Sequence, residues 1–336
     1  MELHLFRDQP HRRYNPLLRE WVLVSPQRAL NPGLPAAKAA PPAASIYDPR
    51  CRLCPGNERT GGVRNPDYDG VAVFEDDMPA LLPGAPEVTL DEGSLIIVQG
   101  EPGICRQVAY MARHDLSFPL FTPAEARAVV DAWAEQYTAL GQTPGIRYVQ
   151  IVERRGGHPH CDIWAGSSLP SRPFREQASF TGYYDARQTC LLCDYLALEQ
   201  VYRERVVCEN ALFTALAPFW AAQRLETMVI SRRHTTGLDL LDSEGRDALA
   251  DVMRRLTARF DNLFRAPLPY VMGLHQRPTD GFPHSEWHLH AHFYPLLPAE
   301  SESAEALGLV ASRQRDSTPE SDAARLRDAP EGEAVG

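Results

Sequence analysis

The sequence predicts an α+β protein built from two similar halves, each with mixed or antiparallel sheets and helices packed on one side. Two observations support this fold class. Short apolar or alternating runs typical of strands are mixed with one long helical pattern in each half. A group of cysteines and histidines also occurs twice, in the same order, which indicates an ancient duplication.

The first half combines strand patterns with one helix whose start is well marked. This helix is predicted to begin at Thr122-Pro123-Ala124-Glu125, which has a capping box and proline at the first helical position. Apolar residues then recur on one helical face to about residue 140. The strand patterns lie at 71–74, 94–98, 107–111 and 147–153.

The second half repeats this order of elements. Apolar residues at helical spacing predict a helix from about 243 to 263. The strand patterns lie near 206–208, 212–216, 226–230, 270–275 and 288–294. We expect the first half to span residues 1–175 and the second half 176–298. Residues 299–336 are acidic with few large apolar side chains, and they predict a poorly ordered tail with a short helix.

The composition excludes several classes of protein. A chain of 336 residues with 44% hydrophobic and 23% charged residues can bury a large core. The net charge of −10 argues against general binding of nucleic acid or of an anionic membrane surface. The start of the sequence does not resemble a signal peptide, and no apolar run approaches the roughly 18–20 residues of a membrane span. We therefore expect a cytoplasmic protein.

The recurring cysteines and histidines have the composition of zinc sites. Each half has a Cys-x-x-Cys pair followed by two histidines. Without a secretion signal, such pairs favour metal ligation over disulfides, and two cysteines with two histidines are typical of zinc. We expect about two zinc ions per chain, one on each of these sets: Cys51, Cys54, His114 and His158; and Cys190, Cys193, His234 and His288.

His158-Pro159-His160 is the candidate centre of the chemistry. It follows the predicted strand that ends near residue 153. We expect the two histidines to point to opposite faces, so that His158 binds metal while His160 faces a substrate. A neutral imidazole is a competent nucleophile near neutral pH, and metal ligation at His158 would orient its neighbour.

Several stretches together resemble the galactose-1-phosphate uridylyltransferase family of the histidine-triad superfamily. The resemblance covers about residues 10 to 297 and is specific in the aggregate. The stretches that carry it are Pro10–Leu17, Trp21–Pro26, Cys51–Asn57, Asn65–Tyr68, His158–Cys161, Pro218–Ala221, Tyr270–Gly273 and Leu289–Pro295.

The resemblance implies two histidine-triad halves, a homodimer, and exchange of uridylyl between UDP-glucose and galactose 1-phosphate by a ping-pong route. The nucleophile that carries the uridylyl group would be His160. The zinc ligands of the first half would be the Cys51 set. The resemblance also implies a second metal site on three histidines and a glutamate from the connection between the halves; the matching histidines are His275, His290 and His292.

The sequence departs from the family around the phosphates. Asp162 stands where the family has glutamine, Asp76 stands where it has asparagine, and the loop before His158 is shorter. A carboxylate beside phosphate is repulsive unless a cation or proton intervenes, and Arg154 or Arg155 is placed to compensate for one such charge. The candidate substrate-binding residues are Arg28, Asp76, Asp77, Arg154 and Asp162.

The predicted second metal set also departs from the family. No glutamate aligns well with the family's ligand, because Gly182 lies near its place. We therefore expect the second zinc on the Cys190 set, with an iron-type site at the three histidines of the family as the alternative.

Three functions remain open at this point. The leading hypothesis is a uridylyltransferase acting on nucleotide sugars and sugar 1-phosphates. The second is a related nucleotide-sugar phosphorylase or adenylyltransferase, which the twin cysteine–histidine sets would fit. The third is a catalytically weak, zinc-stabilised nucleotide-sugar-binding homologue, which the altered phosphate region would favour.

Overall fold

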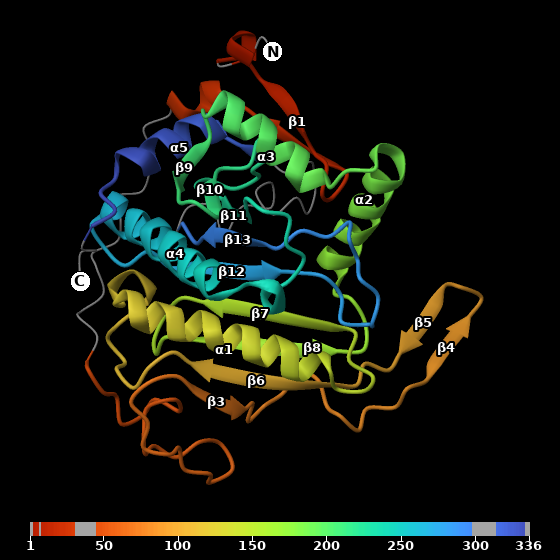
Figure 1. Cartoon of the computed structure of the whole chain (residues 1–336), viewed down its shortest axis with the longest axis vertical. Coiled ribbons are helices and arrows are strands. Elements are labelled where there is room, and N and C mark those ends of the chain that lie inside the picture. The colour runs from red at the N-terminus through yellow and green to blue at the C-terminus, as the bar shows by residue number, and fades with distance from the viewer. Residues whose placement is uncertain (1–2, 7, 31–44, 298–313, 333–336) are drawn as a thin grey trace.

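The computed structural model of the chain describes residues 3–6, 8–30, 45–297 and 314–332 (Figure 1). A nine-stranded sheet runs through the molecule in the order β3-β6-β8-β7-β12-β13-β11-β10-β9. All of its neighbouring strands are antiparallel. The first half contributes β3 (Ala72–Glu75), β6 (Gly103–Ala109), β7 (Tyr148–Arg154) and β8 (His160–Gly166). The second half contributes β9 (Val206–Glu209), β10 (Phe213–Leu216), β11 (Thr227–Ser231), β12 (Tyr270–His275) and β13 (His290–Pro295).

The two halves share this sheet. They meet where β7 pairs with β12, and Gly273 lies opposite Val152. On either side of this junction the order is the same, because β7-β8-β6 in the first half is matched by β12-β13-β11 in the second. The α+β fold class with antiparallel sheets is confirmed, and the sheet is continuous across the predicted halves.

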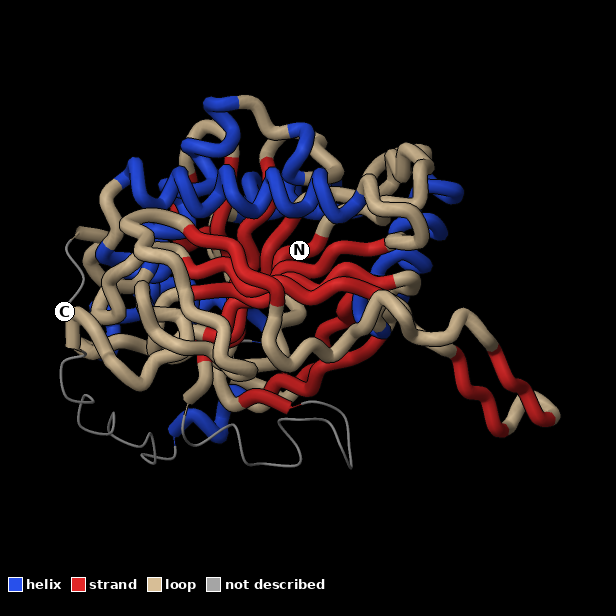
Figure 2. Tube along the Cα trace, turned by 90° about the horizontal axis from the view of Figure 1, so that it is seen from below, coloured by secondary structure: helices blue, strands red, loops and turns tan. Residues whose placement is uncertain are grey.

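Two long helices lie side by side on one face of the sheet (Figures 1 and 2). They are α1 (Pro123–Gly141) and α4 (Ser243–Phe264). The predicted capping box is present: the Thr122 side chain accepts from the Glu125 backbone N–H, and Glu125 accepts from the Thr122 backbone N–H. Aromatic side chains such as Trp133 and Phe260 are fully buried against the sheet. Each contributes about 1.5–3 kcal/mol by leaving water, so this layer forms the main core.

The opposite face of the sheet is covered over the second-half strands. Two helices, α2 (Ser171–Arg187) and α3 (Leu191–Tyr202), belong to a second core with the strand residues Met228 and Ile230. Trp287 lies at the centre of this core and contacts Phe180 of α2. Over the first-half strands β6 and β8, the same face is lined by polar side chains and carries the cavity described below.

Residues 314–332 are packed against the rest of the chain, where the sequence predicted a poorly ordered tail. Strand β14 (Gln314–Arg315) pairs in parallel with β2 (Glu20–Val24), which in turn pairs with β1 (His11–Asn15). Helix α5 (Pro319–Asp328) buries Ala323 and Leu326 against β9 and α4. The short predicted helix is therefore present, but the expected disorder is wrong for this part. Residues 299–313 lie outside the described residues.

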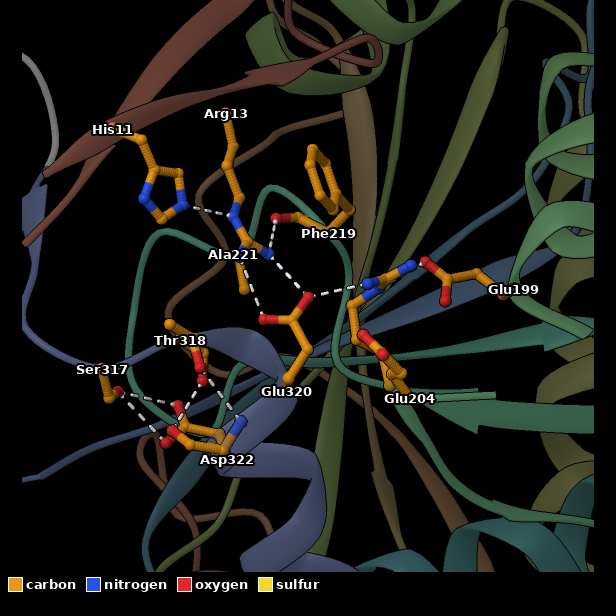
Figure 3. A network of polar contacts seen from close by, with 12 residues as sticks. His11, Arg13, Glu199, Glu204, Phe219, Ala221, Ser317, Thr318, Glu320 and Asp322 are labelled. Atoms are coloured by element: carbon orange, nitrogen blue, oxygen red, sulfur yellow. Dashed lines mark hydrogen bonds and ion pairs between the residues drawn. The ribbon is translucent and has the colours of Figure 1, made fainter. Parts of the chain in front are cut away.

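Buried ion pairs explain why residues 314–332 are packed although their composition predicts disorder (Figure 3). Glu320 Oε1 lies 2.9 Å from Arg13 Nη1 and 2.7 Å from Arg205 Nη1. Arg315 forms a buried pair with Asp322, which also accepts from Ser317. Charge pairing rather than an apolar run orders this segment, so a low count of apolar residues gave no sign of it.

A two-stranded hairpin projects from the first half (Figures 1 and 2). It consists of β4 (Thr89–Glu92) and β5 (Ile96–Gln99), and all of its strand residues are exposed. Its exposed apolar side chains include Leu90, Leu95, Ile96, Ile97 and Val98. The remaining short elements are the 3-10 turns at Leu3–Phe6, Pro26–Leu30, Phe118–Leu120 and Leu238–Leu240. Among the described helices, none is long and apolar enough to cross a membrane.

Candidate active site and metal centres

His160 is the first residue of β8, and its ring is half-buried. Its Nδ1 lies 2.7 Å from the backbone oxygen of His158. Because a carbonyl oxygen can only accept, Nδ1 carries the proton and Nε2 of the neutral ring keeps its lone pair. The backbone therefore selects the tautomer in which Nε2 is free to act as a nucleophile.

A cavity of about 470 Å³ lies on the same face of the sheet. Its lining residues are Arg52, Thr60, Asp76, Met78, Ala80, Gln107, Arg154, Asp162 and Trp164. Asp162 and Trp164 follow His160 at spacings of two along β8, and alternate residues of a strand share a face. His160 is not itself among the lining residues. It lies two residues, about 7 Å of strand, before Asp162 on the same face of β8.

The negative charge of Asp162 is offset by its neighbours. Gln107 Nε2 donates to Asp162 Oδ1 at 3.1 Å, and Arg154 Nη1 lies 3.6 Å from Asp162 Oδ2. The Arg154 side chain remains 60% exposed, so most of its N–H groups are available to a ligand. The repulsion expected from the sequence is thus compensated within the cavity. Gln107 was not singled out in the sequence; its only signal was its alternation within the strand that reaches Ala109.

The other candidate substrate-binding residues divide between the cavity and the scaffold. Asp76 lines the cavity, where its Oδ1 accepts from the backbone N–H of Met78 at 3.0 Å. Asp77 accepts from the backbone N–H of Thr60 at 3.0 Å and pairs with Arg59 at 3.1 Å, so it holds the loop.

Two arginines lie away from the cavity. Arg28 pairs with Asp316 of the C-terminal segment at 3.3 Å and is not among the lining residues. Arg155 is buried and pairs with Asp261 of α4, so of the two consecutive arginines only Arg154 faces the cavity. The suggestion that Arg155 might compensate for a cavity carboxylate is therefore wrong, because alternation along the chain turns it toward the helices.

The first predicted metal set comes together as expected. The ligand atoms of Cys51, Cys54, His114 and His158 all lie within 4.8 Å of one another. Cys54 Sγ lies 3.6 Å from Nδ1 of each histidine. His158 Nε2 lies 2.9 Å from the backbone oxygen of Met111, which keeps the proton on Nε2 and leaves Nδ1 for a metal. This donor set fits zinc.

Two asparagines fix the backbone of the loop that carries Cys51 and Cys54. Asn57 Nδ2 donates to the backbone oxygen of Cys51 at 2.8 Å, and Asn65 Nδ2 donates to that of Cys54 at 2.9 Å. These bonds shape the loop that presents the two thiols. His158 belongs to this ligand set and His160 does not. Strand alternation does not explain the difference, because residues two apart in a strand share a face. They differ because His158 lies in the bend before β8 begins.

The second predicted set also comes together. Ligand atoms of Cys190, Cys193, His234 and His288 lie within 4.8 Å of one another. Cys193 Sγ lies 3.4 Å from Nδ1 of both histidines. His288 Nε2 lies 2.7 Å from the backbone oxygen of Ser231, which again leaves Nδ1 for a metal.

A third set is complete as well, and the sequence had placed no glutamate in it. Glu176 of α2 joins His275, His290 and His292, and the ligand atoms lie within 4.8 Å of one another. Glu176 Oε2 lies 2.6 Å from His275 Nδ1, while Oε1 lies 3.6 Å from His292 Nε2. The expectation that no glutamate serves here is wrong: the connection is helical, and α2 turns Glu176 inward six residues before Gly182. Glu176 repeats with Pro173, Ser179 and Phe180 on the buried face of the helix, a spacing that could have revealed it.

The burial of the third set makes it a suitable site for a cation. Glu176, His290 and His292 are fully buried, and three of the imidazole nitrogens have no hydrogen-bond partner: His290 Nε2 and both ring nitrogens of His292. Unpartnered polar atoms in a core are costly, and a carboxylate with three imidazoles is a suitable donor set for a divalent metal ion.

Two solved structures have the fold of this chain. A solved structure described as "Structure of uridylyltransferase" matches with a TM-score of 0.72, covering 95% of this chain and 97% of that chain at 23% identity. An ADP-glucose phosphorylase from Arabidopsis thaliana, solved with bound ADP-glucose, matches with a TM-score of 0.73 over 96% and 100% of the two chains at 20% identity. The chain thus has the fold of these two structures.

The sequence comparisons define the family. Family models described as galactose-1-phosphate uridyl transferase, N-terminal domain and C-terminal domain, match residues 3–170 and 176–334. The galactose-1-phosphate uridylyltransferase of Haemophilus influenzae is 38% identical over 95% of this chain and 94% of its own length. That of Rattus norvegicus is 38% identical over 96% and 89%. The chain belongs to the galactose-1-phosphate uridyl transferase family.

Proposed function

We propose that the chain exchanges a uridylyl group between UDP-glucose and galactose 1-phosphate through a covalent uridylyl–His160 intermediate. The observation that carries this proposal is the free Nε2 of His160 on the strand face that also carries Asp162 and the cavity lined by Arg154. Membership of the family supports the choice of substrates, as do the relatives described as galactose-1-phosphate uridylyltransferases.

The proposed reaction has two displacements at the α-phosphorus. In the first, Nε2 of His160 forms a bond to phosphorus while the bond to the oxygen of glucose 1-phosphate breaks. Nδ1 keeps its proton, and the carbonyl of His158 stabilises the positive charge that develops on the ring. In the second, an oxygen of galactose 1-phosphate displaces Nε2 and forms UDP-galactose. Arg154 offers charge-assisted hydrogen bonds to the phosphate oxygens in both steps.

Metal ions support this site through the fold. The Cys51 set would hold zinc, and the Glu176 set would hold the second ion that the family implies. When bound, such ions contribute folding free energy and fix the orientation of their ligands. His160 lies two residues after a ligand of the first set. An ion that fixes His158 would therefore also restrain the backbone position of the nucleophile.

Self-association is part of the proposal. The projecting hairpin of β4 and β5 exposes several large apolar side chains, and an isolated two-stranded hairpin is only marginally stable in water. A homodimer in which a second copy covers this hairpin would remove that cost. The cytoplasmic location predicted from the sequence also stays part of the proposal, since the seven cysteines are unpaired and thiol ligands need a reducing compartment.

The experiment is an exchange assay with alternative acceptors. The enzyme is incubated with UDP-glucose and either galactose 1-phosphate or inorganic phosphate, and the nucleotide products are separated. UDP-galactose formation is expected; UDP formed only with inorganic phosphate would instead indicate a phosphorylase. The His160→Gly variant is expected to lose about four orders of magnitude in rate, while the control His284→Asn retains activity. Binding of UDP-glucose without any transfer would contradict the proposal.

A further inference from the structure

The second half brings together two complete sets of metal-binding side chains. The Cys190 set and the Glu176 set share no residue. They are nevertheless adjacent, because His288 of one set is followed at spacings of two by His290 and His292 of the other. The sequence had presented these sets as alternatives, whereas the geometry makes both available at once.

The Cys190 set has the dimensions of a tetrahedral zinc site. Bonds of about 2.3 Å to sulfur and about 2.0 Å to nitrogen in a tetrahedron place the two ligand atoms about 3.5 Å apart. Cys190 Sγ lies 3.4 Å from His288 Nδ1, and Cys193 Sγ lies 3.4 Å from Nδ1 of His234 and of His288. The spacing therefore matches that of ligands around one ion.

The same geometry occurs in the first half. The two histidine rings of each set have centroids 5.4 Å apart. In each set the last histidine donates its Nε2 proton to a backbone oxygen. His158 donates to that of Met111, and His288 donates to that of Ser231. His288 is also fully buried, and Ser231 Oγ lies 2.9 Å from its Nε2. Both rings are thus fixed with Nδ1 directed at two thiols.

The two sets of the second half differ in donor chemistry. The Cys190 set offers two sulfurs, which favour zinc, whereas the Glu176 set offers one carboxylate and three imidazoles, which suit zinc, iron or manganese. The nitrogens of His290 and His292 that lack hydrogen-bond partners belong to the Glu176 set. An ion on the Cys190 set would leave them without a partner. A single ion cannot satisfy both sets.

We propose that the second half binds two ions together, zinc on Cys190, Cys193, His234 and His288 and a separate divalent ion on the Glu176 set, so that the chain carries three. The zinc connects the start of α3 to the segment that enters β13. Cys190 is the N-cap residue of α3 and makes no side-chain capping bond, so its thiol is free for this ligation. The zinc would thereby support the strand that presents His290 and His292.

The experiment counts metal ions on the full chain. The protein is purified without added metal, passed over a chelating resin, and analysed by inductively coupled plasma mass spectrometry for zinc, iron and manganese. We expect three ions per wild-type chain. The Cys190→Ser/Cys193→Ser double variant is expected to lose one zinc and keep two ions, and His292→Ala is expected to lose one ion while both thiol-bound zinc ions remain. The control Cys208→Ser removes a buried thiol outside the sets and is expected to keep all three.

A second measurement does not depend on the folding of the variants. Metal-free wild-type protein is titrated with Co²⁺, whose absorption reports thiolate ligation. Thiolate bands that grow to two equivalents, followed or preceded by a third equivalent without such bands, would support the proposal. Two ions per wild-type chain, or bands that stop at one equivalent, would overturn it.

Discussion

His160 and His290 occupy matching positions in the two halves but have different surroundings. Each donates Nδ1 to the backbone oxygen of the histidine two residues earlier, at 2.7 Å in both cases. His160 is half-buried on the strand face that carries the cavity, whereas Nε2 of His290 is buried 3.8 Å from Glu176. The same backbone hydrogen bond therefore fixes the ring of the proposed nucleophile in one half and of a proposed metal ligand in the other.

The difference lies in what covers the face of the sheet. In the second half, α2 lies over β12 and β13 and supplies Glu176, so the polar face becomes a closed metal centre. In the first half, the position matching His292 is Asp162, which contacts Gln107 and Arg154 and faces a cavity. Duplicated halves can thus keep their ligand geometry while one helix decides whether the site is open to substrate.

The largest effect on stability is expected from removing the carboxylate of the buried Glu176 set in the second half. Glu176→Ala would leave three buried imidazoles without their carboxylate and remove an ion ligand, costing about 3–5 kcal/mol in the free energy of unfolding. Asp162→Ala at the open cavity should cost less than about 1 kcal/mol. Urea unfolding of the two variants beside wild type measures the contrast. Equal losses would show that the two faces are not energetically different.

The next effect concerns the segment that contacts both halves. Glu320 binds Arg13 and Arg205; burial alone would raise its pKa, but these arginines lower it to about 2. A carboxyl whose pKa is depressed on folding stabilises the protein above its unfolded pKa, and this contribution disappears as the pH falls toward 2. Glu320→Gln is expected to cost about 2–3 kcal/mol at neutral pH and to flatten the acid dependence of stability below about pH 4.5.

This pH dependence is measured by urea unfolding between neutral and acid pH. Glu331→Gln, which removes a more exposed partner of Arg255, is the matched control and should change stability by less than about 1 kcal/mol. A Glu320→Gln profile parallel to that of wild type would contradict the assignment of the pKa shift to this network.

A smaller effect is expected at the phosphate-binding side of the cavity. Arg154→Met removes a charged donor that faces the cavity, so KM for UDP-glucose should rise about tenfold, equivalent to about 1.4 kcal/mol. Arg28→Met removes an arginine that pairs with Asp316 instead, and its KM should stay within about twofold of wild type. Steady-state kinetics on both variants distinguish these roles. A larger rise in KM for Arg28→Met would place that arginine at the substrate.

The smallest effect is expected at Asp162. Taken alone, removal of this carboxylate would favour phosphate binding, but Arg154 and Gln107 already offset its charge. We therefore expect Asp162→Gln to change KM for UDP-glucose by less than about threefold. Isothermal titration with UDP-glucose provides the check. A tenfold gain in affinity would mean that the aspartate repels the substrate despite these contacts.

The sequence was sufficient for the features that depend on local pattern. The alternation of 147–153 and the capping box at Thr122 predicted β7 and α1, and the spacing of Cys51 and Cys54 predicted a metal set that the fold assembles. These features follow from backbone geometry and ligand chemistry, both of which act over a few residues.

The features that were missed depend on tertiary contacts. Glu176 becomes a ligand only because α2 crosses the sheet, and Gln107 reaches Asp162 from a neighbouring strand 55 residues away. The order of residues 314–332 depends on Arg13, which lies at the other end of the chain. Periodicity can place Glu176 on the buried face of a helix and Gln107 on one face of a strand, but it does not identify the distant residues that they contact.

The most direct test of the central claim is to locate the covalent intermediate. The enzyme is incubated with UDP-glucose and no acceptor, and the intact and digested protein is analysed by mass spectrometry at alkaline pH, where a phosphoimidazole is stable. We predict one uridylyl group per active chain on the peptide that contains His160, release of glucose 1-phosphate, and loss of both in His160→Gly at unchanged metal content. An adduct on another peptide such as that of His290, or no adduct with any nucleotide sugar, would contradict the account.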